Sequence, residues 1–431
     1  MTAAPASASA SSRPPLPLRQ PRGRSLPTRS LPPRGTTPVG PGPLQFLGLF
    51  VVFVAHPSRS HPMRLPLSFR LPRFLSVVLA VVSAPLAPTA PAAEFPDAAQ
   101  PQLAATTAGR VYLAFGRGPE IFVARSDDAG ATFAAPVRIA ALPSLLLGRR
   151  RGPRIAAHAD TVTVTAMAGE LFAFHSKDGG KTWRGPVRIN DVPGSAREGL
   201  NALAAAPDGR LFTTWLDLRD VPGARTQLFA AESTDGGATW STNTLVYRAP
   251  AGHTVCECCH PSATFNTRGD LAVIWRNGID GARDLWLSTR PAGSTTFTPA
   301  AKLGEGTWLL KACPMDGGTL FPLGDTFATL WQRAGSLFLA RPGTPEIPLG
   351  PGTQPVAATV GPDTHLFFQR GPDLLATRLN ASLTPTAPAP HAQNARFPAL
   401  LALPGVRGSL LAYEQGPAKG PLTVVVEALA P

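Results

Sequence analysis

A short pattern, S-x-D-x-G-x-T followed by an aromatic residue, occurs three times in this chain. The copies span residues 126–133, 176–183 and 233–240, and an alternating apolar run such as 121–126 precedes each one. Aspartate and serine side chains hydrogen-bond to nearby backbone groups, and glycine accepts a positive φ, so the pattern predicts a tight turn between two strands. Its regular recurrence predicts a repeat architecture.

The pattern is similar to the Asp-box, and residues 95–430 resemble the sialidase-like Asp-box (BNR repeat) propellers. The resemblance implies an all-β fold, a β-propeller built from four-stranded blades. Enzymes and non-enzymes share Asp-boxes as structural turns, so Asp128, Asp178 and Asp235 are expected to form turns rather than to catalyse a reaction.

Recurrent units set the expected number of blades. Each unit begins with a small strand, followed by a turn and a strand that ends in an aromatic residue, as in 211–215. Spacings of roughly 40–60 residues predict seven blades, with six as the alternative because catalytic sialidases have six. The expected first strands begin near Gln102, Pro153, Leu200, Pro261, Pro314, Pro355 and Pro398.

The positive charge lies in the leader. The formal net charge is +13, but residues 1–93 contain ten arginines and no lysine, aspartate or glutamate. Without them, 40 − 10 = 30 basic residues face 27 acidic ones, a net of +3. A nucleic-acid partner is therefore not expected.

The leader itself divides in two. Residues 1–62 are expected to be either a mis-assigned start or a disordered basic Pro/Arg-rich extension. Residues 63–93 are typical of a secretory signal peptide, with a basic region, an apolar region at 74–84 and a small-residue cleavage site at 90–92. Residues 94–431 are expected to form a single propeller domain, exported to the periplasm or outside the cell. No stable membrane insertion is expected after signal removal, because no later stretch is long and apolar enough.

Antiparallel strands sort the interesting side chains onto two faces. The Asp-boxes follow strand three, whereas residues just after strand two or just before strand one lie on the opposite face, around the channel mouth. Propellers usually bind ligands there. Units three, four and five bring several charged, aromatic and cysteine side chains to that face.

The cysteines form the sharpest local signal. Sulfur and imidazole ligands suit a soft or borderline metal, so one prediction from these residues is a copper or zinc site. The alternatives are disulfides, such as Cys259–Cys313 or Cys258–Cys313, and free thiols. The candidate ligands are Cys256, Cys258, Cys259, His260 and Cys313, with Met315 nearby.

The arginines suggest a glycan ligand. Several guanidinium groups hold the carboxylate of a sialoside, because a planar fork binds it bidentately. Arg219, Arg276 and Arg283 are candidates for such a clamp. Arg154 resembles the arginine of the sialidase R-I-P signature, although Ala156 stands where that signature has proline. The alternative is a rim of solvated, salt-bridged loop residues.

Catalysis would need further groups. Sialidases use a tyrosine nucleophile and a carboxylate. Asp217 and Asp284 are candidates for the acid and Tyr413 for the nucleophile, although aromatic residues at the position of Tyr413 in sister repeats favour packing. Other repeats carry a tryptophan at the end of the second strand, but Trp308 does not lie at that position. It is a candidate for stacking on a sugar.

Two functional hypotheses follow. The first is an exported sialidase-like propeller that binds a glycan at the channel mouth, either without cleaving it or as an exo-α-sialidase that hydrolyses it. The second is a non-catalytic extracytoplasmic propeller in which a Cys/His cluster holds a metal or disulfides and the rim serves as an interaction module.

Overall fold

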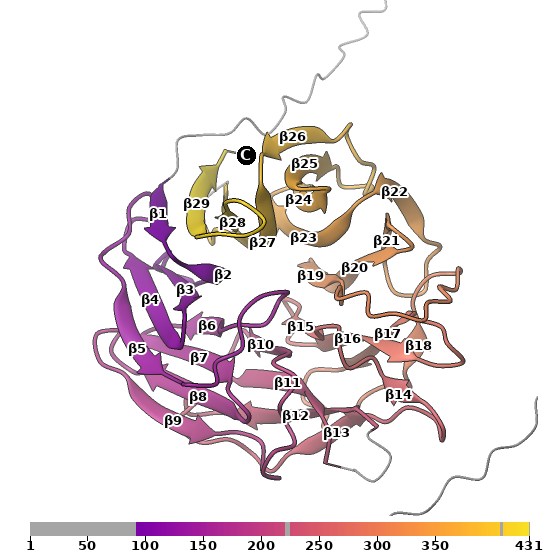
Figure 1. Cartoon of the computed structure of the whole chain (residues 1–431), viewed down its shortest axis with the longest axis horizontal. Helices are drawn as coiled ribbons and strands as arrows, with labels where there is room; N and C mark the ends of the chain where they lie inside the picture. Colours follow the sequence, from indigo (N-terminus) through magenta and orange to yellow (C-terminus); the bar gives the residue numbers. More distant parts are fainter. Residues whose placement is uncertain (1–91, 220–224, 406–407, 431) are drawn as a thin grey trace, which may run out of the picture. The chain divides into compact units, whose positions relative to one another are not determined.

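A computed structural model describes residues 92–219, 225–405 and 408–430, and in these ranges the chain forms seven antiparallel sheets around a central channel (Figure 1). The prediction of an all-β propeller with seven blades is confirmed. No helix occurs in the described ranges, and accordingly none there could cross a membrane. The predicted extension and most of the predicted signal peptide lie outside the described residues.

Each blade, numbered from one to seven in chain order, places its first strand at the channel and its fourth strand outside. The first strands are β2 (Ala99–Ala105), β6 (Arg154–His158), β10 (Asn201–Ala205), β15 (Ser262–Phe265), β19 (Thr319–Leu323), β23 (Thr353–Val360) and β27 (Ala395–Ala402). The second strands are β3 (Val111–Arg117), β7 (Thr161–Met167), β11 (Leu211–Asp217), β16 (Leu271–Gly278), β20 (Thr326–Arg333), β24 (Asp363–Arg370) and β28 (Ser409–Gln415).

The third strands are β4 (Glu120–Ser126), β8 (Leu171–Ser176), β12 (Gln227–Ser233), β17 (Leu285–Arg290), β21 (Ser336–Ala340), β25 (Asp373–Leu379) and β29 (Thr423–Leu429). The outer strands are β5 (Val137–Ala141), β9 (Arg184–Arg188), β13 (Thr244–Tyr247), β18 (Ala301–Lys302), β22 (Ile347–Pro351), β26 (Ala389–Ala392) and β1 (Ala93–Pro96). Blade four carries a fifth strand, β14 (Thr254–Val255), which pairs with the end of β16.

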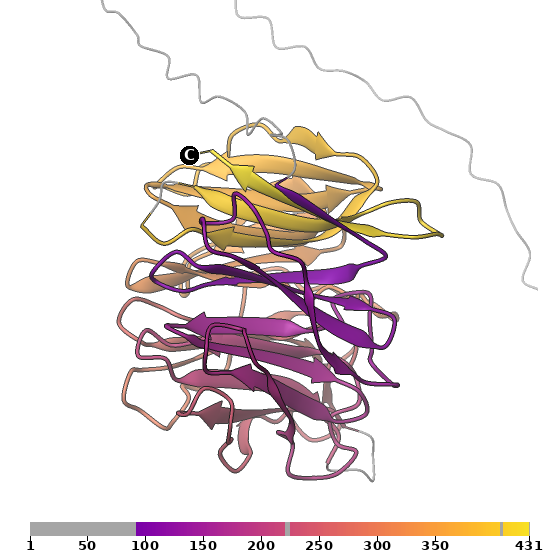
Figure 2. The same cartoon turned by 90° about the vertical axis from the view of Figure 1, so that its left-hand side faces the viewer.

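Blade seven joins the two ends of the domain. Its first three strands come from the C-terminal part of the chain, and β1 supplies the fourth by pairing with β29 from Ala93↔Val426 to Pro96↔Thr423. In the side view the indigo N-terminal strand lies among the yellow C-terminal strands (Figure 2). Backbone hydrogen bonds therefore close the ring.

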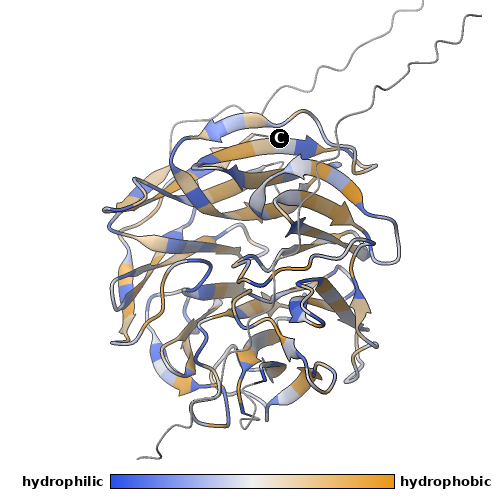
Figure 3. Ribbon diagram, turned by 45° about the vertical axis from the view of Figure 1, so that its right-hand side comes forward, coloured by the Kyte–Doolittle hydropathy of each residue, from blue (hydrophilic) through white to orange (hydrophobic). Residues whose placement is uncertain are grey.

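The second strands form the core because they are covered on both faces by neighbouring blades. All seven residues of β11 are buried, whereas the outer strand β9 is mostly exposed. A strand buried on both faces reads as a continuous apolar run, which is why these strands were recognisable in the sequence. Apolar residues concentrate along the strands and polar residues in many of the loops (Figure 3).

The three repeated turns share one hydrogen-bond pattern. Ser126 Oγ donates to Asp128 Oδ1 at 2.7 Å and accepts from Gly130 N–H at 2.8 Å, while Asp128 accepts from Thr132 N–H at 2.9 Å. The turns at 176–183 and 233–240 repeat these bonds. Gly130 has a φ of 88°, and a Cβ there would lie 2.3 Å from Leu410 of blade seven. The glycine thus permits both the turn and its packing on the preceding blade.

Replacing Asp128 with alanine should destabilise blade one by about 1 kcal/mol, because three donors from Ser126 and Thr132 lose their acceptor. Thermal unfolding measures the effect. The neighbouring Asp127 is the control, since it makes only exposed ion pairs with Arg110 and Arg125, and such pairs contribute little. Equal destabilisation by Asp127→Ala and Asp128→Ala would contradict a structural role specific to the turn.

Candidate functional site

A cavity of about 210 Å³ lies in the channel and is lined by the first strands of all seven blades. Most of its wall consists of small or apolar residues, so charged groups stand out. One lining residue from each blade is Leu103, Arg154, Leu203, Ser262, Thr319, Ala357 and Ala399.

Arg150 and Arg154 bring two positive charges to this cavity. Both are buried, with side chains 6% and 8% exposed. Arg154 donates from Nε to the Asn201 carbonyl at 3.1 Å and from its terminal nitrogens to the carbonyls of Pro153 and Arg150. These bonds use three of the five N–H groups of the guanidinium and leave two without a partner in the described part of the chain.

Arg150 spans the channel from blade two to blades six and seven. It donates to Gln354 Oε1 at 2.8 Å, to the Gln354 carbonyl at 3.0 Å and to the Pro398 carbonyl at 2.7 Å. The loop before β6 is thereby fixed against the far side of the ring.

The charges of the two arginines are balanced differently. Burial lowers the pKa of Arg150 to about 10, and the carboxylates of Asp316 and Glu414 oppose that shift. Burial also lowers the pKa of Arg154 to about 9, the charge of Arg150 adds to the effect, and no carboxylate opposes it. Neither arginine forms an ion pair with another described residue.

His260 faces the cavity and has both ring nitrogens occupied. Nδ1 accepts from Gly317 N–H at 3.3 Å, so Nε2 carries the proton that is donated to the Gly318 carbonyl at 3.1 Å. Burial, followed by the charges of Arg150 and Arg154, holds the pKa of His260 well below its usual range. His260 is therefore a neutral donor, and both nitrogens of this predicted metal ligand are bonded to backbone groups in the structure.

Arg276 joins blades four and five. It is 1% exposed and donates to the carbonyls of Asp316 and Gln332, both at 3.0 Å, and to the carbonyl of Arg283. Its guanidinium lies 5.3 Å from the centre of the Trp308 ring. The predicted clamp residue is thus committed to backbone carbonyls.

Arg283, Asp284 and Trp308 belong to one short antiparallel contact. Arg283 N–H donates to the Trp308 carbonyl at 2.8 Å, and Trp308 N–H donates to Asp284 Oδ1 at 2.9 Å. Asp284 is only 9% exposed. Its carboxylate holds the segment around Trp308 against blade four, and Trp308 in turn covers Arg276.

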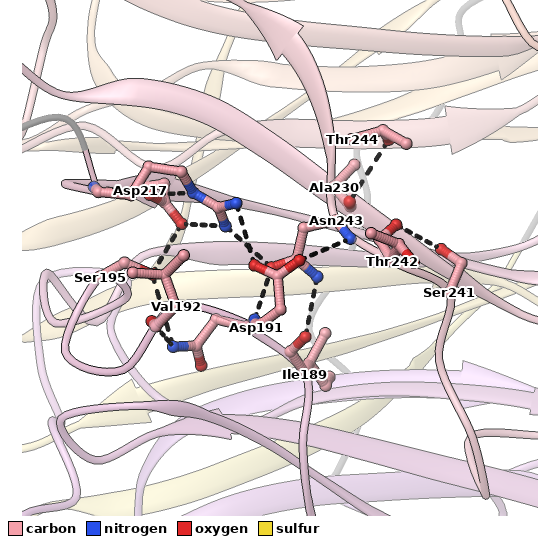
Figure 4. Close-up of polar contacts among 12 residues, drawn as sticks. Ile189, Asp191, Val192, Ser195, Asp217, Ala230, Ser241, Thr242, Asn243 and Thr244 are labelled. Carbon is pink, nitrogen blue, oxygen red and sulfur yellow. Dashed lines mark hydrogen bonds and ion pairs between the residues drawn. The ribbon is translucent and has the colours of Figure 1, made fainter.

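Asp217 and Arg219 form a network between blades two and three (Figure 4). Asp217 is fully buried and accepts from Ser195 Oγ at 2.9 Å, from Trp215 Nε1 at 2.8 Å and from the backbone and guanidinium of Arg219. Arg219 also pairs with Asp191 at 3.0 Å and lies 3.7 Å from the Phe229 ring centre. Both side chains are fully engaged in joining loops.

Tyr413 lies inside blade seven rather than at the cavity. It is 2% exposed and donates to Glu427 Oε1 at 2.7 Å, while His391 bonds the other oxygen at 2.6 Å. Burial and the Glu427 hydrogen bond raise the pKa of Tyr413 well above its usual range. This environment opposes the phenolate that a nucleophile requires.

Three of the four cysteines converge beside the end of β16. Cys256 Sγ lies 3.5 Å from Cys258 Sγ and 3.6 Å from Cys259 Sγ, and all three thiols are buried. Hydrogen bonds from Cys258 and Cys259 lower the pKa of Cys256, whereas burial raises the pKa of Cys259 to about 12. Cys313 is exposed and lies outside this group, and all four thiols are free in the structure.

Arg150 is a cavity residue that is not among the site residues predicted from the sequence. Arg150 lies in the run 149–151, immediately before the first strand of blade two. That position is on the predicted ligand-binding side, so its place before strand one was the available signal. Its partners Gln354 and Pro398 lie more than 200 residues away and could not be inferred.

No family model and no curated protein sequence matches the chain. Solved structures that resemble it include a Dyadobacter fermentans protein of unknown function, at 17% identity and a TM-score of 0.47, covering 78% of this chain and 95% of that one. A Hadza microbial sialidase, Hz136, shows 15% identity and a TM-score of 0.47, covering 77% of this chain and 65% of that one. A Penicillium chrysogenum α-L-arabinanase shows 14% identity and a TM-score of 0.44, covering 77% and 93%. The fold assignment rests on the strand pairing of this chain itself.

Replacing Asp217 with alanine should lower the free energy of unfolding by about 3 kcal/mol, because buried donors lose a charged acceptor. Denaturant unfolding measures this loss. Asp191→Ala removes the other carboxylate on Arg219, but Asp191 is 41% exposed, so about 1 kcal/mol or less is expected. Equal losses for the two variants would contradict this account.

Tyr413→Phe should lower the free energy of unfolding by about 1.5–3 kcal/mol, because the hydroxyl donates to buried Glu427. The wild type and the folded variant should hydrolyse a fluorogenic sialoside at the same rate. A folded variant that has lost a hydrolytic activity of the wild type would contradict the structural role of Tyr413 and favour a role as nucleophile.

Proposed function

We propose that this chain binds a small carboxylate-bearing ligand, an acidic sugar unit by class, in the central cavity through Arg150 and Arg154. One observation carries the proposal: two buried guanidinium groups lie on the cavity wall, and within the described ranges no carboxylate balances the charge of Arg154. The proposal concerns binding and does not depend on cleavage.

The energetic argument starts from the cost of burying charge. An unpaired ion loses several kcal/mol of solvation in a protein interior. Carbonyl groups hold Arg154 in place but carry no net charge to offset its own. A carboxylate in the cavity would supply that charge and could accept the unused N–H groups in the bidentate geometry that guanidinium favours.

Size and sequence narrow the class of ligand. About 210 Å³ is below the roughly 300 Å³ at which pockets for drug-sized ligands begin, which favours a single sugar unit over an extended chain. The resemblance of the repeats to sialidase-like propellers favours a sugar acid over other carboxylates. His260 lines the cavity beside the two cations as a neutral ring, so it adds no further charge there.

The geometry supports binding better than hydrolysis. Asp217, Asp284 and Tyr413 are each committed to internal hydrogen bonds, so they are not available as an acid and a nucleophile at the cavity. We therefore favour a binding module over an enzyme. The signal peptide predicted at residues 63–93 would place this module outside the cytoplasm.

Calorimetric titration with N-acetylneuraminate and galacturonate tests the proposal. Both acids should bind, and neutral galactose should not. Arg154→Ala should weaken binding by about 10- to 100-fold, because a hydrogen bond to a charged group contributes about 1.5–3 kcal/mol. Arg154→Lys should fall between the wild type and Arg154→Ala, because it keeps the charge but loses the fork.

Arg138→Ala is the matched control. Arg138 lies on an outer strand, is 59% exposed and pairs with Glu120, so its loss should leave affinity unchanged. Galactose binding as tightly as the acids, or Arg154→Ala binding like the wild type, would contradict the proposal.

A further inference from the structure

We propose that Cys256, Cys258 and Cys259 bind one Cu(I) ion. Their three Sγ atoms all lie within 4.8 Å of one another, with separations of 3.5 and 3.6 Å from Cys256 to the other two. Sulfurs about 2.3 Å from a shared ion lie roughly 3.8–4.0 Å apart in tetrahedral or trigonal geometry. The two separations from Cys256 therefore differ from this geometry by only a few tenths of an ångström, and all three sulfurs are close enough to share an ion.

Backbone hydrogen bonds beside the cluster keep the three sulfur atoms close to one another. Strand β14 is the extra strand of blade four, and it pairs Val255 with Asn277 at the end of β16. Cys256 N–H then donates to the Arg276 carbonyl at 2.8 Å. These bonds fix the first residue of the turn at 256–259, and the three cysteines of this turn are buried.

The ligand set is made of sulfur alone. Met315 packs against the three cysteines and adds a soft thioether to the group. Its φ of 56° is unusual for a residue other than glycine, and its carbonyl accepts from Gln354 Nε2 at 2.7 Å. Thiolate and thioether ligands favour Cu(I), whereas the imidazole of His260 is occupied elsewhere.

Positive charge accompanies the sulfurs. Arg276 lies beside the sulfurs, since Cys256 N–H donates to its carbonyl, and its guanidinium donates in turn to the carbonyl of Arg283. Arg283 Nε is buried and has no hydrogen-bond partner among the described residues. One Cu(I) with three thiolates carries a net charge of −2, which two neighbouring guanidinium groups can offset in a buried site.

This inference does not depend on the carboxylate proposal, because the two use different side chains. Titration of the reduced full-length chain with Cu(I), without oxygen and in competition with a chromogenic Cu(I) chelator, should give one ion per chain. Cys256→Ser and Cys259→Ser should each weaken binding at least about tenfold. Cys313→Ser is the matched control and should bind like the wild type, because Cys313 is exposed and outside the cluster.

Two measurements on the wild type guard against variants that fail to fold. X-ray absorption of the copper complex should show sulfur ligands only, and bound Cu(I) should raise the midpoint of thermal unfolding. Nitrogen ligands, copper binding that survives Cys256→Ser, or zinc bound in preference to Cu(I) would overturn the proposal. So would a disulfide involving Cys256, Cys258 or Cys259 in protein prepared without reductant.

Discussion

The pairing of β1 with β29 is the constraint on which the other features depend. Four residues at the start of the domain hydrogen-bond to a strand more than 300 residues later, and this closes seven sheets into a ring. Only a closed ring surrounds the cavity with all seven first strands. It also brings Arg150 of blade two within reach of Gln354 and Pro398 in blades six and seven. The geometry of the cavity is therefore set by contacts that are distant in sequence.

The buried arginines of this ring differ in their role, and their hydrogen-bond and ion-pair partners show the difference. Arg219 meets Asp217 and Asp191, so its charge is balanced inside the protein and its role is to join loops. In the part of the chain that the structure describes, Arg154 donates only to carbonyl groups, and it lies beside a second cation. Arg276 also donates to carbonyl groups, but Trp308 covers it and it does not line the cavity. It is the position of Arg154 on a cavity wall, together with its unbalanced charge, that points to a ligand of opposite charge.

The blade count could be predicted from the sequence because it depends on local signals. Turn residues recur at fixed positions, and second strands such as β11 are apolar throughout because both faces are covered. The roles of single side chains could not be predicted, since their partners lie in other blades or strands. The sequence predicts Arg276 as part of a ligand clamp, whereas in the structure it donates to the carbonyls of Asp316 and Gln332 of blade five. The spacing of the cysteines predicts that they come together, but it does not reveal that Cys313 lies apart from the other three or that His260 bonds to Gly317 and Gly318.

The segment 315–318 lies between the sulfur cluster and the cavity and contributes to both. Met315 packs on the cysteines, and the Asp316 carboxylate acts on Arg150. Gly317 and Gly318 bond both nitrogens of His260, and a Cβ at Gly317 would lie 1.7 Å from the His260 carbonyl oxygen. Asp316 also accepts from Gln354 N–H at 2.7 Å, so the segment is fixed to blade six as well. Glycine is required where the segment meets His260 because any larger residue would collide with that carbonyl. These four residues therefore connect the two sites through contacts that each of them makes, from the cysteines at one end to the cavity wall at the other.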